Sequence, residues 1–268
     1  MREWETKSMH SATLVVAAGL LVICHGACAE SWYRWKDDNG RSRVSHDHPP
    51  MGTPFVEFQM PDPIRWSNAP DMPAEIADET RVSPQKLFKL ASQSVYWVLK
   101  SNSSGPLDSG AVVYGSAVAI SEDLALTNCH VMAGAGEDAQ IGSGDQGSVS
   151  QAILVAANYA LDRCVIKSRD LQLHPIAGIR RADTLEVGES VYAIGNPSHF
   201  DRTLSDGLIS GKRMIGEQRM LQTTAPISPG SSGGGLFDTR GNLVGITTSG
   251  LKNSQSINFA IPAEDFWK

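Results

Sequence analysis

The sequence predicts an all-β fold, built as a barrel or a sandwich. From residue 95 to residue 266, short β-branched and apolar runs alternate with Gly, Asn, Ser and Asp, which favour turns. No long helical pattern alternates with these runs, so a parallel α/β sheet is not expected. One short helix is expected over 84–91. The expected strands are 95–99, 111–120, 125–127, 153–157, 164–166, 191–194, 207–210, 243–248 and 258–261, and a further strand is expected to begin at Leu236.

The composition is that of a globular protein and argues against nucleic acid as a partner. The chain has 268 residues, of which 41% are hydrophobic, and this is enough for a sizeable core. Its 23 basic and 29 acidic residues give a net charge of −6 and form no basic stripe for a phosphate backbone. No zinc-binding spacing occurs, so we expect no metal and no cofactor.

The first 29 residues have the pattern of a secretory signal peptide. Arg2 and Lys7 precede an apolar run over 14–23, and the small-residue site Ala-Cys-Ala follows at 27–29. The run is shorter than the roughly 18 residues that span a bilayer, so no membrane span is expected after cleavage. We therefore expect cleavage before Glu30 and an exported protein, periplasmic or secreted.

A small β unit and a proline-rich segment are expected ahead of the main domain. Aromatic residues at 32–35 and the Arg-Ser-Arg-Val run at 41–44 flank Asn39-Gly40, which strongly indicates a tight hairpin turn. A lone hairpin is marginally stable in water, so this one should pack on something else. The expected organisation is a signal peptide at 1–29, a small β domain at 30–60, a proline-rich linker at 61–83 and the main domain at 84–268.

One set of residues has the composition of an acyl-transfer site. Such chemistry needs a serine hydroxyl, a base, a carboxylate that orients the base, and backbone donors for the oxyanion. Ser232 lies in the glycine-rich stretch 230–235, His130 follows an apolar strand, and Asp162 leads into a short strand. Taken singly, each has an ordinary alternative: a flexible loop, a structural histidine and a turn aspartate.

Other titratable residues are weaker candidates for chemistry. Cys129 and Cys164 are an even pair in an exported chain, so they are either a disulfide or two separate buried thiols. Four other histidines are interpreted as linker or surface residues: His46, His48, His174 and His199. Three acids lie in polar loops: Asp138, Asp145 and Asp170.

Three motifs resemble, in chain order, the His, Asp and Ser motifs of trypsin-like serine peptidases, closest to the bacterial HtrA/Deg branch. They are Thr-Asn-Cys-His-Val at 127–131, Leu-Asp-Arg-Cys-Val-Ile-Lys at 161–167 and Ile-Ser-Pro-Gly-Ser-Ser-Gly-Gly at 227–234. The resemblance covers about residues 84–268 and implies two six-stranded antiparallel β-barrels of chymotrypsin type. The N-terminal hairpin resembles a short domain at the front of many bacterial envelope proteins. No PDZ domain is expected, because the chain ends at Lys268.

The resemblance implies a catalytic role for each motif residue. Ser232 would be the nucleophile, His130 the general base and then the acid, and Asp162 the partner of the imidazole. The oxyanion hole would lie at Gly230, Ser231 and Ser232, with the amides of the first and last as donors. A disulfide between the two cysteines beside this triad would brace it.

The substrate pocket follows from the same resemblance. Its base would lie near 224–227 and one wall at Thr247, Thr248 and Ser249. Neither segment contains an acid, so cleavage after Lys or Arg is not favoured, and small or medium aliphatic residues are expected before the scissile bond.

The expected function is that of a secreted serine endopeptidase acting on envelope or unfolded polypeptides through an acyl-enzyme. The alternative is a non-catalytic or latent binding protein, chaperone-like, on the protease fold. The complete triad speaks against it, because such proteins commonly lose a member. An α/β-hydrolase esterase is excluded by the order His, Asp, Ser. The sequence does not set the oligomeric state.

Overall fold

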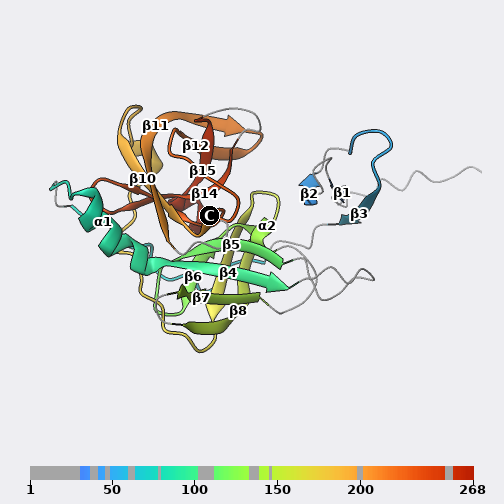
Figure 1. The fold of residues 1–268 in the computed structure, drawn as a ribbon, viewed down its shortest axis with the longest axis horizontal. Coiled ribbons are helices and arrows are strands. Elements are labelled where there is room, and N and C mark those ends of the chain that lie inside the picture. Colours follow the sequence, from blue (N-terminus) through green and yellow to red (C-terminus); the bar gives the residue numbers. More distant parts are fainter. Residues whose placement is uncertain are drawn as a thin grey trace, which may run out of the picture.

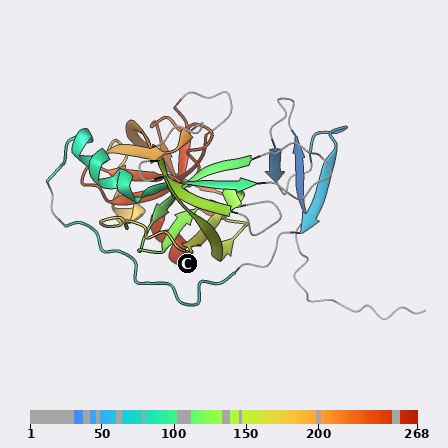
Figure 2. The same cartoon turned by 60° about the horizontal axis from the view of Figure 1, so that its bottom comes forward.

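The computed structural model describes residues 31–36, 42–45, 49–59, 64–77, 80–101, 112–132, 139–144, 147–197, 202–250 and 256–268 (Figure 1). The expected signal peptide at 1–29 lies outside these residues. Strands dominate the described chain, and Figure 2 shows the small N-terminal sheet as a separate unit beside the barrels.

The N-terminal unit is a three-stranded antiparallel sheet rather than a two-stranded hairpin. β1 (Ser31–Lys36) pairs with β2 (Ser42–Ser45) on one edge and with β3 (Phe55–Gln59) on the other. The rings of Tyr33 and Phe55 meet edge to face, with centroids 5.4 Å apart. The sequence prediction missed β3 because its five residues lie among prolines. The third strand supplies the packing that a lone hairpin lacks.

The main domain consists of two closed six-stranded antiparallel barrels, which confirms the chymotrypsin-like expectation. The first barrel has the order β4-β5-β6-β9-β8-β7, with β4 (Val95–Ser101), β5 (Val112–Ala119), β6 (Leu124–Thr127), β7 (Ala139–Ser143), β8 (Ser148–Asn158) and β9 (Arg163–Ser168). The second has the order β10-β11-β12-β15-β14-β13, with β10 (Ser190–Gly195), β11 (Thr203–Ile215), β12 (Gln218–Thr223), β13 (Gly235–Asp238), β14 (Leu243–Gly250) and β15 (Asn258–Pro262).

The helices are short. The expected helix α1 (Pro84–Ala91) begins after Ser83, whose hydroxyl accepts a hydrogen bond from the Lys86 amide, and it buries Leu87. A second helix, α2 (Cys129–Met132), follows β6. Three 3₁₀ turns complete the described helical structure: η1 (Ser92–Ser94), η3 (Ala182–Thr184) and η5 (Ala263–Trp267). None of the helices in the described part of the chain is both long and apolar enough to span a bilayer.

Three groups of buried side chains form the core. Val98, Ile141 and Ile166 fill the first barrel, and a second group fills the other barrel, with Ile209, Leu221 and Leu236 among its members. The third group takes residues from both barrels and from α1: Leu87, Val118, Leu126, Val165, Ile194, Phe237 and Ile246. Burial of this shared apolar surface holds the barrels together and fixes the loops that meet between them.

The proline-rich segment runs in extended form over both barrels, and "strap" here means its described residues, 64–77 and 80–83. Ile64 exchanges two backbone hydrogen bonds with Ala157 of β8, at 2.9 and 3.0 Å. Further along, the Ile76 amide donates to Asn242 Oδ1 at 2.8 Å. The strap also lies against the C-terminal turn, where the Trp267 indole donates to the Pro70 carbonyl at 2.8 Å.

Candidate active site

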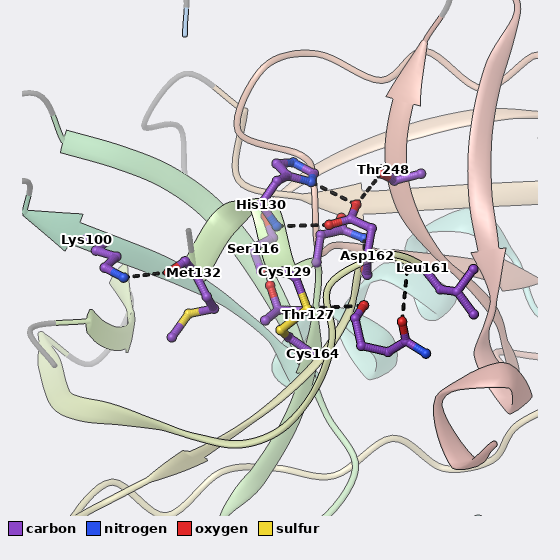
Figure 3. The surroundings of a disulfide bond; sticks show 12 residues. Lys100, Ser116, Thr127, Cys129, His130, Met132, Leu161, Asp162, Cys164 and Thr248 are labelled. Carbon is purple, nitrogen blue, oxygen red and sulfur yellow. Dashed lines mark hydrogen bonds and ion pairs between the residues drawn. A yellow bond between two sulfur atoms is a disulfide. The ribbon is translucent and has the colours of Figure 1, made fainter. Parts of the chain in front are cut away.

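His130 and Asp162 form a doubly hydrogen-bonded pair between the barrels. The turn of α2 carries His130, and Asp162 is the last residue before β9. His130 Nδ1 lies 2.8 Å from Asp162 Oδ2, and the His130 backbone N–H donates to Asp162 Oδ1 at 2.9 Å (Figure 3). The carboxylate therefore fixes both the ring and the main chain of the histidine, which favours the tautomer with the proton on Nδ1.

The backbone of Asp162 is held in an uncommon conformation. Its φ is +53°, the left-handed region that Asp and Asn enter more readily than other non-glycine residues. Its N–H donates to the Tyr159 carbonyl at 3.2 Å, and its carbonyl accepts from the Cys129 amide at 3.4 Å and the Asn128 side chain at 3.2 Å. These contacts join the turn before β9 to the start of α2. Main-chain hydrogen bonds therefore fix the positions of the two catalytic candidates relative to each other.

Thr248 of β14 gives Asp162 a third hydrogen bond. Its Oγ1 donates to Asp162 Oδ2 at 3.0 Å, so a residue of the second barrel orients a carboxylate of the first (Figure 3). The sequence prediction assigned Thr248 to the pocket wall and did not foresee this contact, because the two residues are 86 positions apart.

The pKa of the His130 imidazole lies above its ordinary value. Desolvation lowers the pKa, but the charge of Asp162 and the hydrogen bond to it raise the pKa by more. Because 45% of the side-chain surface stays exposed, desolvation is partial and the carboxylate decides the direction of the shift. The pair therefore favours the imidazolium that forms when His130 accepts a proton. Its contribution to fold stability is present below pH about 6.5 and is lost as pH rises through the raised pKa.

Main-chain hydrogen bonds connect the loop that carries Ser232 to both barrels. The Ser232 carbonyl accepts from the Ser116 amide of β5 at 2.7 Å, and the Gly233 amide donates to the Thr247 carbonyl of β14 at 2.8 Å. Gly233 has φ of +86°, and an added Cβ would lie 1.8 Å from the Ser116 carbonyl oxygen. Only glycine fits this position.

The Ser232 hydroxyl donates to the Thr248 carbonyl at 2.6 Å, not to His130. The three catalytic candidates are thus gathered between the barrels, but the serine rests in a rotamer turned toward β14. The hydroxyl must exchange this hydrogen bond for one to the imidazole before its proton reaches His130, and catalytic hydrogen bonds often tighten only when substrate binds.

The amides of the expected oxyanion hole differ in their hydrogen bonding. The Ser231 N–H donates to the Ser228 carbonyl at 2.9 Å, so this amide already has an acceptor within the loop. Among the described residues, no carbonyl accepts from the amides of Gly230 or Ser232, and Gly230 has φ of +98°. These two amides are the ones available to a developing oxyanion.

Ser116 contributes to the site in a way that the sequence did not reveal. Its hydroxyl donates to the Gly230 carbonyl at 2.9 Å and accepts from the Asn196 amide at 2.9 Å. It therefore holds the glycine of the expected oxyanion hole. The sequence marks Gly115-Ser116 only as a further match to the resembled family, and the hydrogen bonds of Ser116 depend on contacts with distant residues.

The residues expected in the pocket wall have different surroundings. Thr247 is buried and its hydroxyl donates to the Ser231 carbonyl at 2.6 Å, so it holds the serine loop. Thr248 faces Asp162, as described above. The main chain of Ser249 lies in β14, and its side chain lies outside the described structure.

Cys129 and Cys164 form a disulfide directly beside the pair. The bond joins the first residue of α2 to the second residue of β9, with Cα atoms 4.9 Å apart, and both residues are buried (Figure 3). Because His130 follows one cysteine and Asp162 lies two residues before the other, the bridge clamps the two segments that carry the pair.

Breaking this disulfide should destabilise the protein by about 3–4 kcal/mol, the chain-entropy value for a loop of this length. The double variant Cys129→Ala/Cys164→Ala and the reduced wild type should both show this loss in urea unfolding, measured against oxidised wild type. Two free thiols in the denatured, unreduced mature protein would contradict the bridge itself.

The comparisons with known proteins agree with the fold. Residues 115–246 match the family model described as "Trypsin-like peptidase domain". A probable periplasmic serine endoprotease DegP-like from Pseudomonas fulva is 30% identical over 238 residues, which cover 83% of this chain and 49% of that protein. Serine endoprotease DegS from Escherichia coli is 33% identical over 201 residues, 69% of this chain and 56% of the relative.

A solved structure, "HtrA-type protease AlgW with tripeptide", superposes with a TM-score of 0.60 and is 34% identical, covering 68% of this chain and 60% of that one. The fold and the family match identify a trypsin-like peptidase domain in this chain. Within that class it belongs to the Deg/HtrA type. The chain spans about half the length of these curated relatives.

Proposed function

We propose that this protein is an exported serine endopeptidase that cleaves polypeptides through His130, Asp162 and Ser232. The observation that carries the proposal is the pair of hydrogen bonds that the Asp162 carboxylate accepts from the main chain and the ring of His130, beside the loop of Ser232 that is held by both barrels. The relatives named as serine endoproteases, and the AlgW structure titled with a tripeptide, support a polypeptide substrate.

The proposed reaction proceeds through an acyl-enzyme. Ser232 Oγ forms a bond to the scissile carbonyl carbon while its proton passes to His130 Nε2. The carbonyl oxygen becomes an oxyanion held by the Gly230 and Ser232 amides. Collapse breaks the C–N bond, and His130 returns the proton to the leaving amine. Water then repeats the sequence, releasing the acid and restoring the serine.

A fluorophosphonate probe tests the nucleophile directly. The probe should label the mature protein at one position, and mass spectrometry of the tryptic peptides should place the label on Ser232. The same preparation should hydrolyse casein. A protein that is neither labelled nor able to cut casein would support the alternative, a non-catalytic binding protein on the protease fold.

Export is the second part of the proposal. It rests on the charged, apolar and small-residue pattern of the first 29 residues and is supported by the relative named as periplasmic. Periplasmic protein from a bacterial host should begin at Glu30 in N-terminal sequencing. Recovery of only the full-length chain from the cytoplasm would contradict export.

A further inference from the structure

We propose that Ser116 is a positioning residue for the oxyanion hole, and that its buried hydroxyl sets the orientation of the peptide unit between the two oxyanion amides. The inference rests on the proposed peptidase function and deepens it. It adds a residue of the first barrel, outside the triad and outside the glycine-rich loop, on which stabilisation of the transition state depends.

The main chain of Ser116 is held on both sides before any substrate arrives. Its N–H donates to the Ser232 carbonyl at 2.7 Å, and its carbonyl accepts from the Thr127 hydroxyl at 2.7 Å. Ser116 lies within β5 and has no exposed surface. Its side chain therefore starts from a rigid strand, and its distance from the nucleophile loop is fixed by direct hydrogen bonds.

The hydrogen bonds of the Ser116 hydroxyl leave it one orientation. Its oxygen accepts from the backbone N–H of Asn196 at 2.9 Å and from Asn196 Nδ2 at 3.4 Å. A backbone N–H can only donate, so the proton of the hydroxyl is directed elsewhere, and it goes to the Gly230 carbonyl at 2.9 Å. A hydroxyl has one proton to donate and two lone pairs, and all three are used here.

The carbonyl that Ser116 holds belongs to the peptide unit in the middle of the oxyanion hole. That planar unit contains the Gly230 carbonyl and the Ser231 N–H, and the latter donates to the Ser228 carbonyl at 2.9 Å. The unit is thus held at both ends. The amides of Gly230 and Ser232 flank it, so its orientation determines where those two donors point. Gly230, at φ of +98°, has the conformational freedom to turn away once the carbonyl is released.

Ser116→Ala removes the hydroxyl without adding volume and tests the inference. The kcat for a peptide substrate should fall roughly 10- to 100-fold with KM nearly unchanged, somewhat less than the loss of a whole oxyanion donor. The contacts between Asp162 and His130 are untouched, so the acid limb of kcat/KM should stay where it is in wild type.

A peptide aldehyde provides a readout that a structural role would not move. Ser232 Oγ adds to the aldehyde carbon and its proton passes to His130, so the adduct places an oxyanion in the hole. Affinity for the aldehyde should fall in Ser116→Ala by about the same factor as kcat/KM. Affinity for the corresponding peptide alcohol, which forms no adduct, should be unchanged. An equal loss for both ligands would indicate general damage and overturn the inference.

The matched control is Ser168→Ala in β9. Ser168 is also buried, and its hydroxyl oxygen accepts from the Leu171 amide at 3.2 Å, away from the serine loop. This variant should keep the wild-type kcat and aldehyde affinity. If Ser116→Ala does not fold, Ser116→Cys decides, because the thiol is a weaker donor of similar size and should lower kcat roughly 3- to 10-fold.

The outcomes separate this inference from the proposed function. Folded variants at Ser116 with the kcat and aldehyde affinity of wild type would overturn the inference alone. A wild type that neither reacts with the fluorophosphonate probe nor cleaves casein would overturn the proposed function and this inference with it.

Discussion

Ser232→Ala should lower the hydrolysis of casein by roughly 10⁵-fold or more, because removal of the nucleophile leaves only oxyanion stabilisation and binding. The fold should be unaffected. The Ser232 main chain is held by the Ser116 amide, and its hydroxyl makes a single hydrogen bond to the Thr248 carbonyl. The variant should therefore unfold thermally like wild type while losing both turnover and fluorophosphonate labelling.

The matched control is Ser228→Ala in the same loop. Ser228 is exposed, and it is the main-chain carbonyl of Ser228, not its side chain, that accepts the hydrogen bond from the Ser231 amide. This variant should keep activity within about 3-fold of wild type, as surface substitutions usually do. Full casein activity in Ser232→Ala would remove Ser232 from the mechanism.

Asp162→Asn should lower kcat by about 10⁴-fold while leaving the fold intact. Asn tolerates the positive φ of position 162 as well as Asp does. Its side chain, however, cannot both accept from the His130 main chain and stabilise an imidazolium. The carboxylate that fixes the tautomer and balances the developing charge is lost.

The pH profile separates this explanation from general damage. His130 acts as a base only when neutral, so activity falls as pH drops through its pKa, which Asp162 raises above about 6.5. In Asp162→Asn only desolvation remains, and desolvation lowers the pKa. The acid limb of kcat/KM should therefore move to lower pH. An acid limb that stays in place or moves upward would show that Asp162 does not set the titration of His130.

The motif residues were predictable because the three motifs together, in the order His, Asp, Ser, resemble those of trypsin-like peptidases. His130 follows Leu124–Thr127, and Asp162 leads into Arg163–Ser168, so their positions relative to the barrel follow from local sequence. The strand pattern likewise predicted most of the barrels. Two barrel strands escaped, Ala139–Ser143 and Gln218–Thr223, because their polar residues obscure the alternation.

The supporting contacts of the site were not predictable from local sequence. The hydrogen bond from Thr248 to Asp162 joins two barrels, and the one from Ser116 to Gly230 joins residues 114 positions apart. Ser232 shows a further limit, because its motif predicts a nucleophile but not the hydrogen bond that its hydroxyl makes. Such features depend on tertiary packing.

The anchoring of Ile64 limits how far the N-terminal sheet can travel. β3 ends at Gln59, five residues before Ile64, and an extended chain covers at most about 3.6 Å per residue. The end of the sheet therefore stays within about 18 Å of Ile64. Ile64 is bonded to Ala157, whose partner in β9 is Cys164, two residues past Asp162. The sheet is thus tethered near His130 and Asp162, and its local concentration there does not depend on dilution of the protein.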